Sequence, residues 1–182
     1  MAYDWNTEWE TERFLQLWDK RIRSGVRHTS EAWDQRAHNW ERELREDGKK
    51  QVRSERRIAE TVSYLLSQGL LGSGDTVVDI GCGPGRFAVE FAHHAGHVTG
   101  VDLSPQMVEY GAAFAAECGV DNVDFTACDF KTADIAAMGW EGKFDLVFSS
   151  ITPAVSGREG FEKMERMSRG WCFNSSFAHA AD

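Results

Sequence analysis

Apolar residues recur every three or four positions over much of the first 68 residues of the chain. This spacing places them along one face of a helix. Ser30 suits the start of one such helix, and Gly69 suits the end of the next. The apolar stripes of the two predicted helices are Trp33, Ala37, Trp40 and Leu44, and Ile58, Val62, Leu65 and Leu66.

From residue 75 onward, short apolar runs alternate with helical patterns. Several runs are apolar on consecutive residues, which is typical of strands covered by helices on both faces. The alternation predicts an α/β fold with a doubly wound, mainly parallel sheet of about five strands. The predicted strands are residues 76–80, 97–101, 123–126, 144–149 and 171–174, and the predicted helices are residues 86–95, 105–118 and 159–168.

The length of 182 residues and the 42% apolar content are sufficient for one sizeable core. We expect residues 1–68 to form a helical N-terminal extension and residues 69–182 to form the sheet domain. The tryptophans of the extension have two interpretations. They either anchor its helices on the sheet domain or form an aromatic lid over a ligand.

Residues 77–87 read Val-Val-Asp-Ile-Gly-Cys-Gly-Pro-Gly-Arg-Phe, a buried strand followed by a glycine turn and a helix. Glycine lets the chain turn sharply and lets a ligand approach the main chain. A dinucleotide site prefers Gly-x-Gly-x-x-Gly, so that a pyrophosphate rests on the helix N-terminus. Here Arg86 stands where the last glycine would be, and Asp79 precedes the turn. A carboxylate at that position suits a cationic ligand better than a pyrophosphate.

Asp102 ends the next predicted strand. An acid about 20 residues after the glycine turn binds ribose hydroxyls in nucleotide-binding folds. The alternative is that Asp102 only caps the helix that begins at Pro105. Asp129 is open to a similar alternative, because it also stands where a strand ends.

Four motifs in order resemble a class I S-adenosylmethionine-dependent methyltransferase over residues 75 to about 175. They are the glycine motif 77–87, the strand end 98–107, the Cys-Asp-Phe segment 128–130 and the strand 144–150. The resemblance implies S-adenosyl-L-methionine as cofactor and a Rossmann-like fold. Members of the family complete the sheet with an antiparallel hairpin, which this chain lacks, so we expect a domain that is incomplete at its C-terminus.

The resemblance also implies roles for individual residues. Asp79 and the backbone of the glycine turn would hold the methionine end, and Asp102 would accept the ribose hydroxyls. Leu103 and Met107 would flank the adenine. The remaining implied cofactor residues are Gly81, Cys82, Gly83 and Gly85 in the turn, Cys128, Asp129 and Phe130 at the adenine edge, and Ser149 beside the methyl group.

Residues 33–37 are similar to N-terminal stretches of small-molecule methyltransferases. Trp33 and Arg36 are therefore predicted in the acceptor pocket, together with Ser150. No residue is assigned as a catalytic acid or base, and no metal site is expected. Where amino-methylating relatives carry Asn-Pro-Pro-Tyr, residues 150–153 read Ser-Ile-Thr-Pro, which disfavours methylation of nucleobase amines.

Charge is distributed unevenly. Residues 1–60 hold 13 of the 20 Lys and Arg and 13 of the 29 acids, so the remaining residues carry the net charge of −9. Nucleic acid is therefore predicted to be an unlikely partner, since affinity for phosphate backbones depends on Lys and Arg. Neither a signal peptide nor a membrane span is recognisable, and a cytoplasmic location is expected.

The predicted function is methyl transfer from S-adenosylmethionine to a small-molecule acceptor. One alternative is a cofactor-binding module, or one half of a split methyltransferase, without turnover of its own. A further alternative is an NAD-dependent oxidoreductase that uses Asp102 on the ribose. An uncovered fifth strand would promote association, so a homodimer or a partner chain over that edge is also expected.

Overall fold

A five-stranded parallel sheet forms the centre of the protein in a computed structural model that describes residues 12–13, 16, 29–46 and 48–176. The strand order is β3-β2-β1-β4-β5, and every neighbouring pair is parallel. This arrangement confirms the predicted doubly wound fold. The strands are β1 (Thr76–Ile80), β2 (His97–Asp102), β3 (Val123–Ala127), β4 (Phe144–Ser150) and β5 (Ser168–Ser175).

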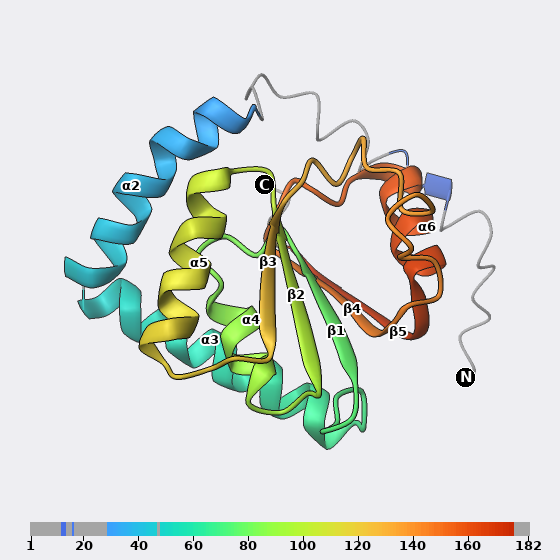
Figure 1. The fold of residues 1–182 in the computed structure, drawn as a ribbon, viewed down its shortest axis with the longest axis horizontal. Helices are drawn as coiled ribbons and strands as arrows, with labels where there is room; N and C mark the ends of the chain where they lie inside the picture. Colours follow the sequence, from blue (N-terminus) through green and yellow to red (C-terminus); the bar gives the residue numbers. More distant parts are fainter. Residues whose placement is uncertain (1–11, 14–15, 17–28, 47, 177–182) are drawn as a thin grey trace.

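Helices cover both faces of the sheet (Figure 1). Helices α3, α4 and α5 lie on one face, with α2 outside them against α3 and α5, and α6 lies on the other face. The turns that precede β4 complete the second face, because Ile135 and Trp140 pack in the same cluster as Met164 of α6. The helices are α2 (Ser30–Glu46), α3 (Gly48–Ser67), α4 (Arg86–Ala92), α5 (Pro105–Glu117) and α6 (Gly157–Met167).

Successive residues of the central strands belong to different cores, as the pleat of a strand requires. In β1, Val77 packs on the side of α3 and α4, whereas Val78 packs on the side of α6. In β4, Leu146 and Phe148 face the first core and Val147 faces the second. This double burial is the reason why these strands are apolar on consecutive positions.

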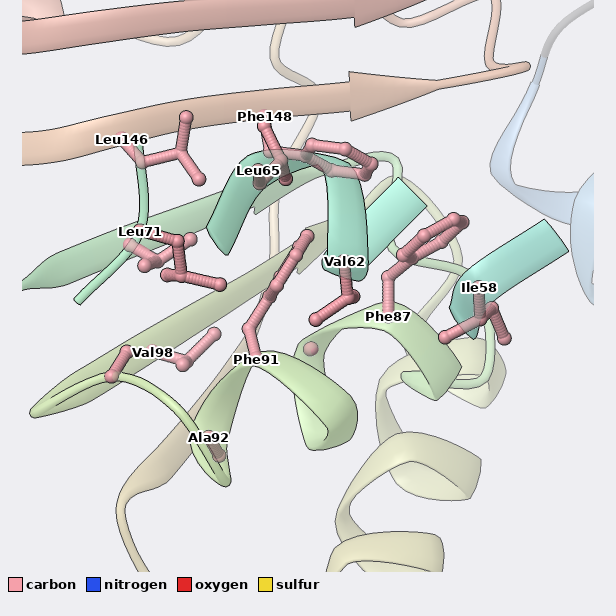
Figure 2. Packing of buried hydrophobic residues seen from close by; sticks show 13 residues of the cluster. Ile58, Val62, Leu65, Leu71, Phe87, Phe91, Ala92, Val98, Leu146 and Phe148 are labelled. Atoms are coloured by element: carbon pink, nitrogen blue, oxygen red, sulfur yellow. The ribbon is translucent and has the colours of Figure 1, made fainter. Parts of the chain in front are cut away.

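Helix α3 contributes directly to the first core. Ile58, Val62 and Leu65 lie in one cluster with Phe91 of α4 and Phe148 of β4, and Figure 2 shows these side chains converging between the two helices and the strand. Helices α2 and α3 lie within residues 1–68, most of residues 1–28 lie outside the described part, and the division into an N-terminal extension and a sheet domain stays a prediction. In α2, the predicted stripe includes Trp40 and Leu44, whose side chains are also outside the described part.

The ring of Phe125 in β3 accounts for the presence of glycine at two positions in neighbouring elements. A Cβ atom added at Gly100 of β2 or at Gly111 of α5 would lie 2.6 Å from the Phe125 ring. These distances are far shorter than a van der Waals contact. The ring therefore fills space that larger residues at the two positions would occupy, and it brings β2, β3 and α5 close together.

The largest differences from the predicted boundaries occur at α4 and β5. Helix α4 ends at Ala92 because the chain turns at His93 and His94 toward β2. Strand β5 begins at Ser168, earlier than predicted, although its first residues are polar. Arg169 bonds both carboxylate oxygens of Asp145 at 2.7 and 2.8 Å, which holds the start of β5 against β4.

Candidate functional site

A cavity lies at the carboxyl ends of the strands, with about 730 Å³ of empty space that includes open solvent at its mouth. Its walls come from the segments that follow β1, β2, β3 and β4, together with one residue of α2. The strand order reverses between β1 and β4, and ligands of doubly wound sheets bind beside such a reversal. The lining residues are Trp33, Gly81, Gly83, Val101, Asp102, Leu103, Met107, Cys128, Asp129, Phe130, Lys131, Ile151, Thr152, Pro153 and Ala154.

The structure brings together most of the residues that the sequence singled out. Residues from three separate turns meet at the cavity, as expected for the ends of adjacent parallel strands. The predicted residues that line it are Trp33, Gly81, Gly83, Asp102, Leu103, Met107, Cys128, Asp129 and Phe130. The predicted residues outside the lining are Arg36, Asp79, Cys82, Gly85, Ser149 and Ser150.

Asp102 connects two of the turns that form the cavity. Its Oδ2 accepts the amide hydrogen of Gly83 at 2.9 Å, and its Oδ1 accepts that of Ser104 at 2.9 Å. A carboxylate has about four acceptor sites, so hydroxyl groups can still be accommodated. Burial raises the pKa of Asp102, and the amide hydrogen bonds from Ser104 and Gly83 act in the opposite direction. The residue both shapes the cavity and presents an acceptor within it.

Asp79 is a buried carboxyl group behind the glycine turn, with only 2% of its surface exposed. Burial and then the nearby Asp102 raise its pKa to about 8, while Arg57 of α3 and the amide of Ala88 act in the opposite direction. Within the described residues, its Oδ2 has no hydrogen-bond partner. An unpartnered buried carboxylate oxygen is costly, and a nearby cationic ligand would stabilise its charged form.

The glycine turn is in close contact with the segment after β4. Gly81 has a φ of 71°, and a Cβ there would lie 2.1 Å from Oγ1 of Thr152. Ile151, which precedes that threonine, has a φ of 51°, a strained value for a β-branched residue. By contrast, a Cβ at Gly83 would meet nothing within 4 Å. The backbone near Gly83 is therefore open to a ligand, as the sequence argument required.

Helix α2 closes one side of the cavity through Trp33. The guanidinium of Arg36 lies 5.0 Å from the centre of the Trp33 ring, and Arg36 is not among the lining residues. Trp33 is thus at the cavity wall, whereas Arg36 is exposed and reaches the cavity only through the tryptophan.

The two predicted serines at the end of β4 are engaged by β5. The hydroxyl of Ser149 is fully buried and donates to Oδ1 of Asn174 at 3.0 Å. The hydroxyl of Ser175 donates to that of Ser150 at 2.8 Å. Both serines therefore pair β4 with β5, and the cavity wall begins one residue later, at Ile151.

Sequence reasoning missed the wall formed by residues 151–154, and it missed Lys131. The signal for the former was present, because Thr152 and Pro153 directly follow a predicted buried strand whose carboxyl end faces the site. Lys131 follows Phe130 and carried no pattern of its own. No local pattern indicated that the hydroxyl of Ser104 donates a hydrogen bond to Asp34 of α2.

A family profile described as a methyltransferase domain matches residues 71–170 of the chain. Among curated relatives, the 23S rRNA (uracil(1939)-C(5))-methyltransferase of Hahella chejuensis is 35% identical over 112 residues, which cover 59% of this chain. The matched part is 24% of that protein. The chain therefore spans about a quarter of the length of such relatives.

Two solved structures show the same fold. A candidate S-adenosyl-L-methionine-dependent methyltransferase from Methanococcus maripaludis superposes with a TM-score of 0.63 at 16% identity, covering 79% of this chain and 63% of that chain. A methyltransferase from Thiobacillus denitrificans, solved in complex with S-adenosyl-L-homocysteine, gives a TM-score of 0.53 at 23% identity, covering 65% and 47%.

The prediction that nucleic acid is an unlikely partner is wrong. Relatives that are 35% and 36% identical are named as rRNA methyltransferases. The net charge of the chain is a poor guide to the acceptor, because the matched region is 24% or less of each of these relatives. The charge of a cofactor-binding domain does not decide which acceptor a larger protein uses.

The profile match covers more than half of the chain, and the solved structures share its fold. Among the described residues, every helix is too short or too polar to cross a membrane. The family predicted from the four motifs is confirmed, and the predicted cofactor agrees with the neighbour of the same fold that was solved with S-adenosyl-L-homocysteine. The chain belongs to the methyltransferase domain family.

Proposed function

We propose that the cavity between the glycine turn and Trp33 is the S-adenosylmethionine site and that the chain catalyses methyl transfer from it. The observation that carries the proposal is the convergence of Gly83, Asp102 and Phe130 on one cavity at the point where the sheet order reverses. The cofactor supplies an electrophilic methyl group on a sulfonium, and the protein supplies binding and alignment.

The residues fit such a ligand. Asp102 would accept the ribose hydroxyls, while Leu103 and Met107 would lie along the adenine, with Asp129 and Phe130 at its edge. Buried Asp79, with its free Oδ2, favours positive charge near the glycine turn. A sulfonium or an amino group near Asp79 would stabilise the ionised form of that carboxyl group, so cofactor binding and loss of its proton would favour each other.

The acceptor would enter between Trp33 and residues 151–153. These residues line the cavity and are not assigned to the cofactor. In this arrangement α2 acts as the predicted lid, because it excludes water and shapes the acceptor side. RNA is the first acceptor class to test, since the curated relatives are named for uracil methylation in 23S rRNA. A small-molecule acceptor, which the resemblance of residues 33–37 favoured, is the second.

Calorimetry with S-adenosylhomocysteine and with NAD tests the cofactor assignment. We expect saturable binding of S-adenosylhomocysteine and none of NAD, because Arg86 replaces the glycine that a pyrophosphate turn needs. Preferred binding of NAD would overturn the proposal. Transfer of a labelled methyl group to ribosomal RNA, and separately to a small-molecule extract, then identifies the acceptor class.

A second candidate is a cofactor-binding module without turnover of its own. The observation that favours it is the extent of the match, which is 24% of the Hahella relative. In that case S-adenosylhomocysteine would bind normally, yet no labelled methyl group would reach either acceptor. Methyl transfer by the isolated chain would exclude this candidate.

A further inference from the structure

The first turn of α2 is fastened to the turn that follows β2. The hydroxyl of Ser30 donates to the carbonyl of Leu103 at 3.2 Å. In the opposite direction, the hydroxyl of Ser104 donates to the carboxylate of Asp34, and the amide of Gln106 lies 3.4 Å from the same Oδ1. Two reciprocal links therefore join segments that are about 70 residues apart in the chain.

Ser104 is the centre of this connection and is fully buried. Its hydroxyl caps α5 by accepting the amide of Met107 at 3.1 Å, and its own amide donates to Asp102 at 2.9 Å. One residue thus joins the carboxylate of Asp34 to the carboxylate that faces the cavity. The position also suits a negative charge, because Asp34 lies at the N-terminus of α5.

Helical spacing places Trp33 beside these links. Trp33 and Asp34 follow Ser30 by three and four residues, so both lie on the same side of α2 as Ser30. Ser30 and Asp34 hold that face against residues 103–106, and Trp33 forms part of the cavity wall. The distance between the tryptophan and the turn that carries Asp102 is therefore set by the two polar links.

We propose that Asp34 is a positioning residue for the cofactor. This inference rests on the proposed function of the cavity. Asp34 fixes the turn that carries Asp102 and Leu103, and it holds Trp33 across the cavity, so that bound cofactor leaves slowly. If Asp34 only anchored α2, its replacement would lower the melting temperature of the cofactor-free protein and would leave the rate of cofactor release unchanged.

The test measures the affinity and the dissociation rate of S-adenosylhomocysteine, followed by calorimetry and by tryptophan fluorescence in stopped flow. For Asp34→Ala we expect an affinity about 10- to 100-fold lower, mostly through faster dissociation, because a charged partner of the buried Ser104 hydroxyl is removed from a partly buried hydrogen bond. Asp34→Asn keeps an oxygen that can accept from Ser104, and it should recover most of the loss. Glu31→Gln, an exposed change in the same turn of α2, is the matched control and should bind as the wild type does.

The outcomes are distinct. Unchanged affinity and dissociation in a folded Asp34→Ala protein would overturn the inference while leaving the proposed function intact. Failure of the wild type to bind S-adenosylhomocysteine would instead overturn the proposed function. If Asp34→Ala does not fold, Ser30→Ala removes the other link alone, and it must then accelerate dissociation for the inference to stand.

Discussion

Asp79 makes the stability of the cofactor-free protein depend on pH. Its pKa is raised from 3.8 to about 8 in the folded protein, chiefly by burial. The folded state therefore retains a proton that the unfolded chain releases above about pH 4. The stabilisation associated with this proton is complete at low pH and is lost as pH rises toward 8.

We expect Asp79→Asn to remove this dependence. Between about pH 5 and pH 8 the free energy of unfolding of the wild type should fall relative to that of the variant, by roughly 1 to 3 kcal/mol for one poorly satisfied buried group. Urea unfolding at several pH values measures the difference. Asp121→Asn, at an exposed acid, is the control, and parallel pH curves for wild type and Asp79→Asn would contradict the prediction.

Gly81 tests the close contact between the glycine turn and Thr152. We expect Gly81→Ala to destabilise the protein and to weaken cofactor binding, because the new methyl group would collide with the threonine at a backbone conformation that already disfavours alanine. The conformational part alone costs about 1 to 2 kcal/mol. Gly119→Ala is the matched control, since Gly119 has a φ of 68° and open space around it. Thermal melting of both variants should show the larger loss for Gly81→Ala.

The resemblance of local motifs to a known family was sufficient to predict much of the lining, because Asp102, Leu103 and Met107 belong to one such motif, which ends a strand and starts a helix. Asp34 could not be predicted in the same way. Its role depends on a contact with Ser104 across about 70 residues, and no local pattern encodes which surface of α2 meets that turn. Ser149 and Ser150 show the opposite case. They were predicted at the site, but the pairing of β4 with β5 gives their hydroxyl groups partners in β5 instead.

At the scale of elements, α3 is part of the main core. Leu65 is fully buried among side chains of α4 and β4, whereas the adjacent Leu66 is 38% exposed. We expect Leu65→Ala to reduce the free energy of unfolding by about 2 to 5 kcal/mol, as is typical for a buried leucine. Leu66→Ala should cost much less, and chemical denaturation compares the two. Equal losses would mean that α3 does not pack as described.

The strands were predictable because burial on both faces leaves a continuous apolar run, as in β1 and β4. The start of β5 was not, because residues 168–170 are polar or glycine. The ion pair between Arg169 and Asp145 holds that segment in the sheet. A tertiary interaction of this kind extends a strand beyond its own apolar pattern.

At the scale of the whole molecule, cofactor binding should stabilise the fold. A ligand at about 100 times its dissociation constant contributes about 2.7 kcal/mol, which corresponds to a rise in melting temperature of roughly 5 to 10 °C for a protein of this size. We expect this rise with S-adenosylhomocysteine in differential scanning fluorimetry. NAD at the same concentration is the control, and an equal shift with both ligands would argue against a selective site.

The fold of the sheet domain and its family could be predicted because several ordered motifs act together, and each is local. The acceptor could not, because it contacts surfaces from distant segments and depends on residues such as Trp33 whose position only tertiary packing determines. The cytoplasmic location and the oligomeric state stay predictions.

Phe125 restricts which residue types positions 100 and 111 can accept. Its ring occupies the volume that a methyl group at either glycine would need, so neither position can accept alanine while the phenylalanine remains. A smaller side chain at 125 would remove the closest contact at both positions, leaving the Sγ atom of Cys82, 3.2 Å away, as the next neighbour at position 100. These three sites are therefore expected to co-vary among homologous chains, with a compensatory change in one strand permitting changes in a second strand and a helix.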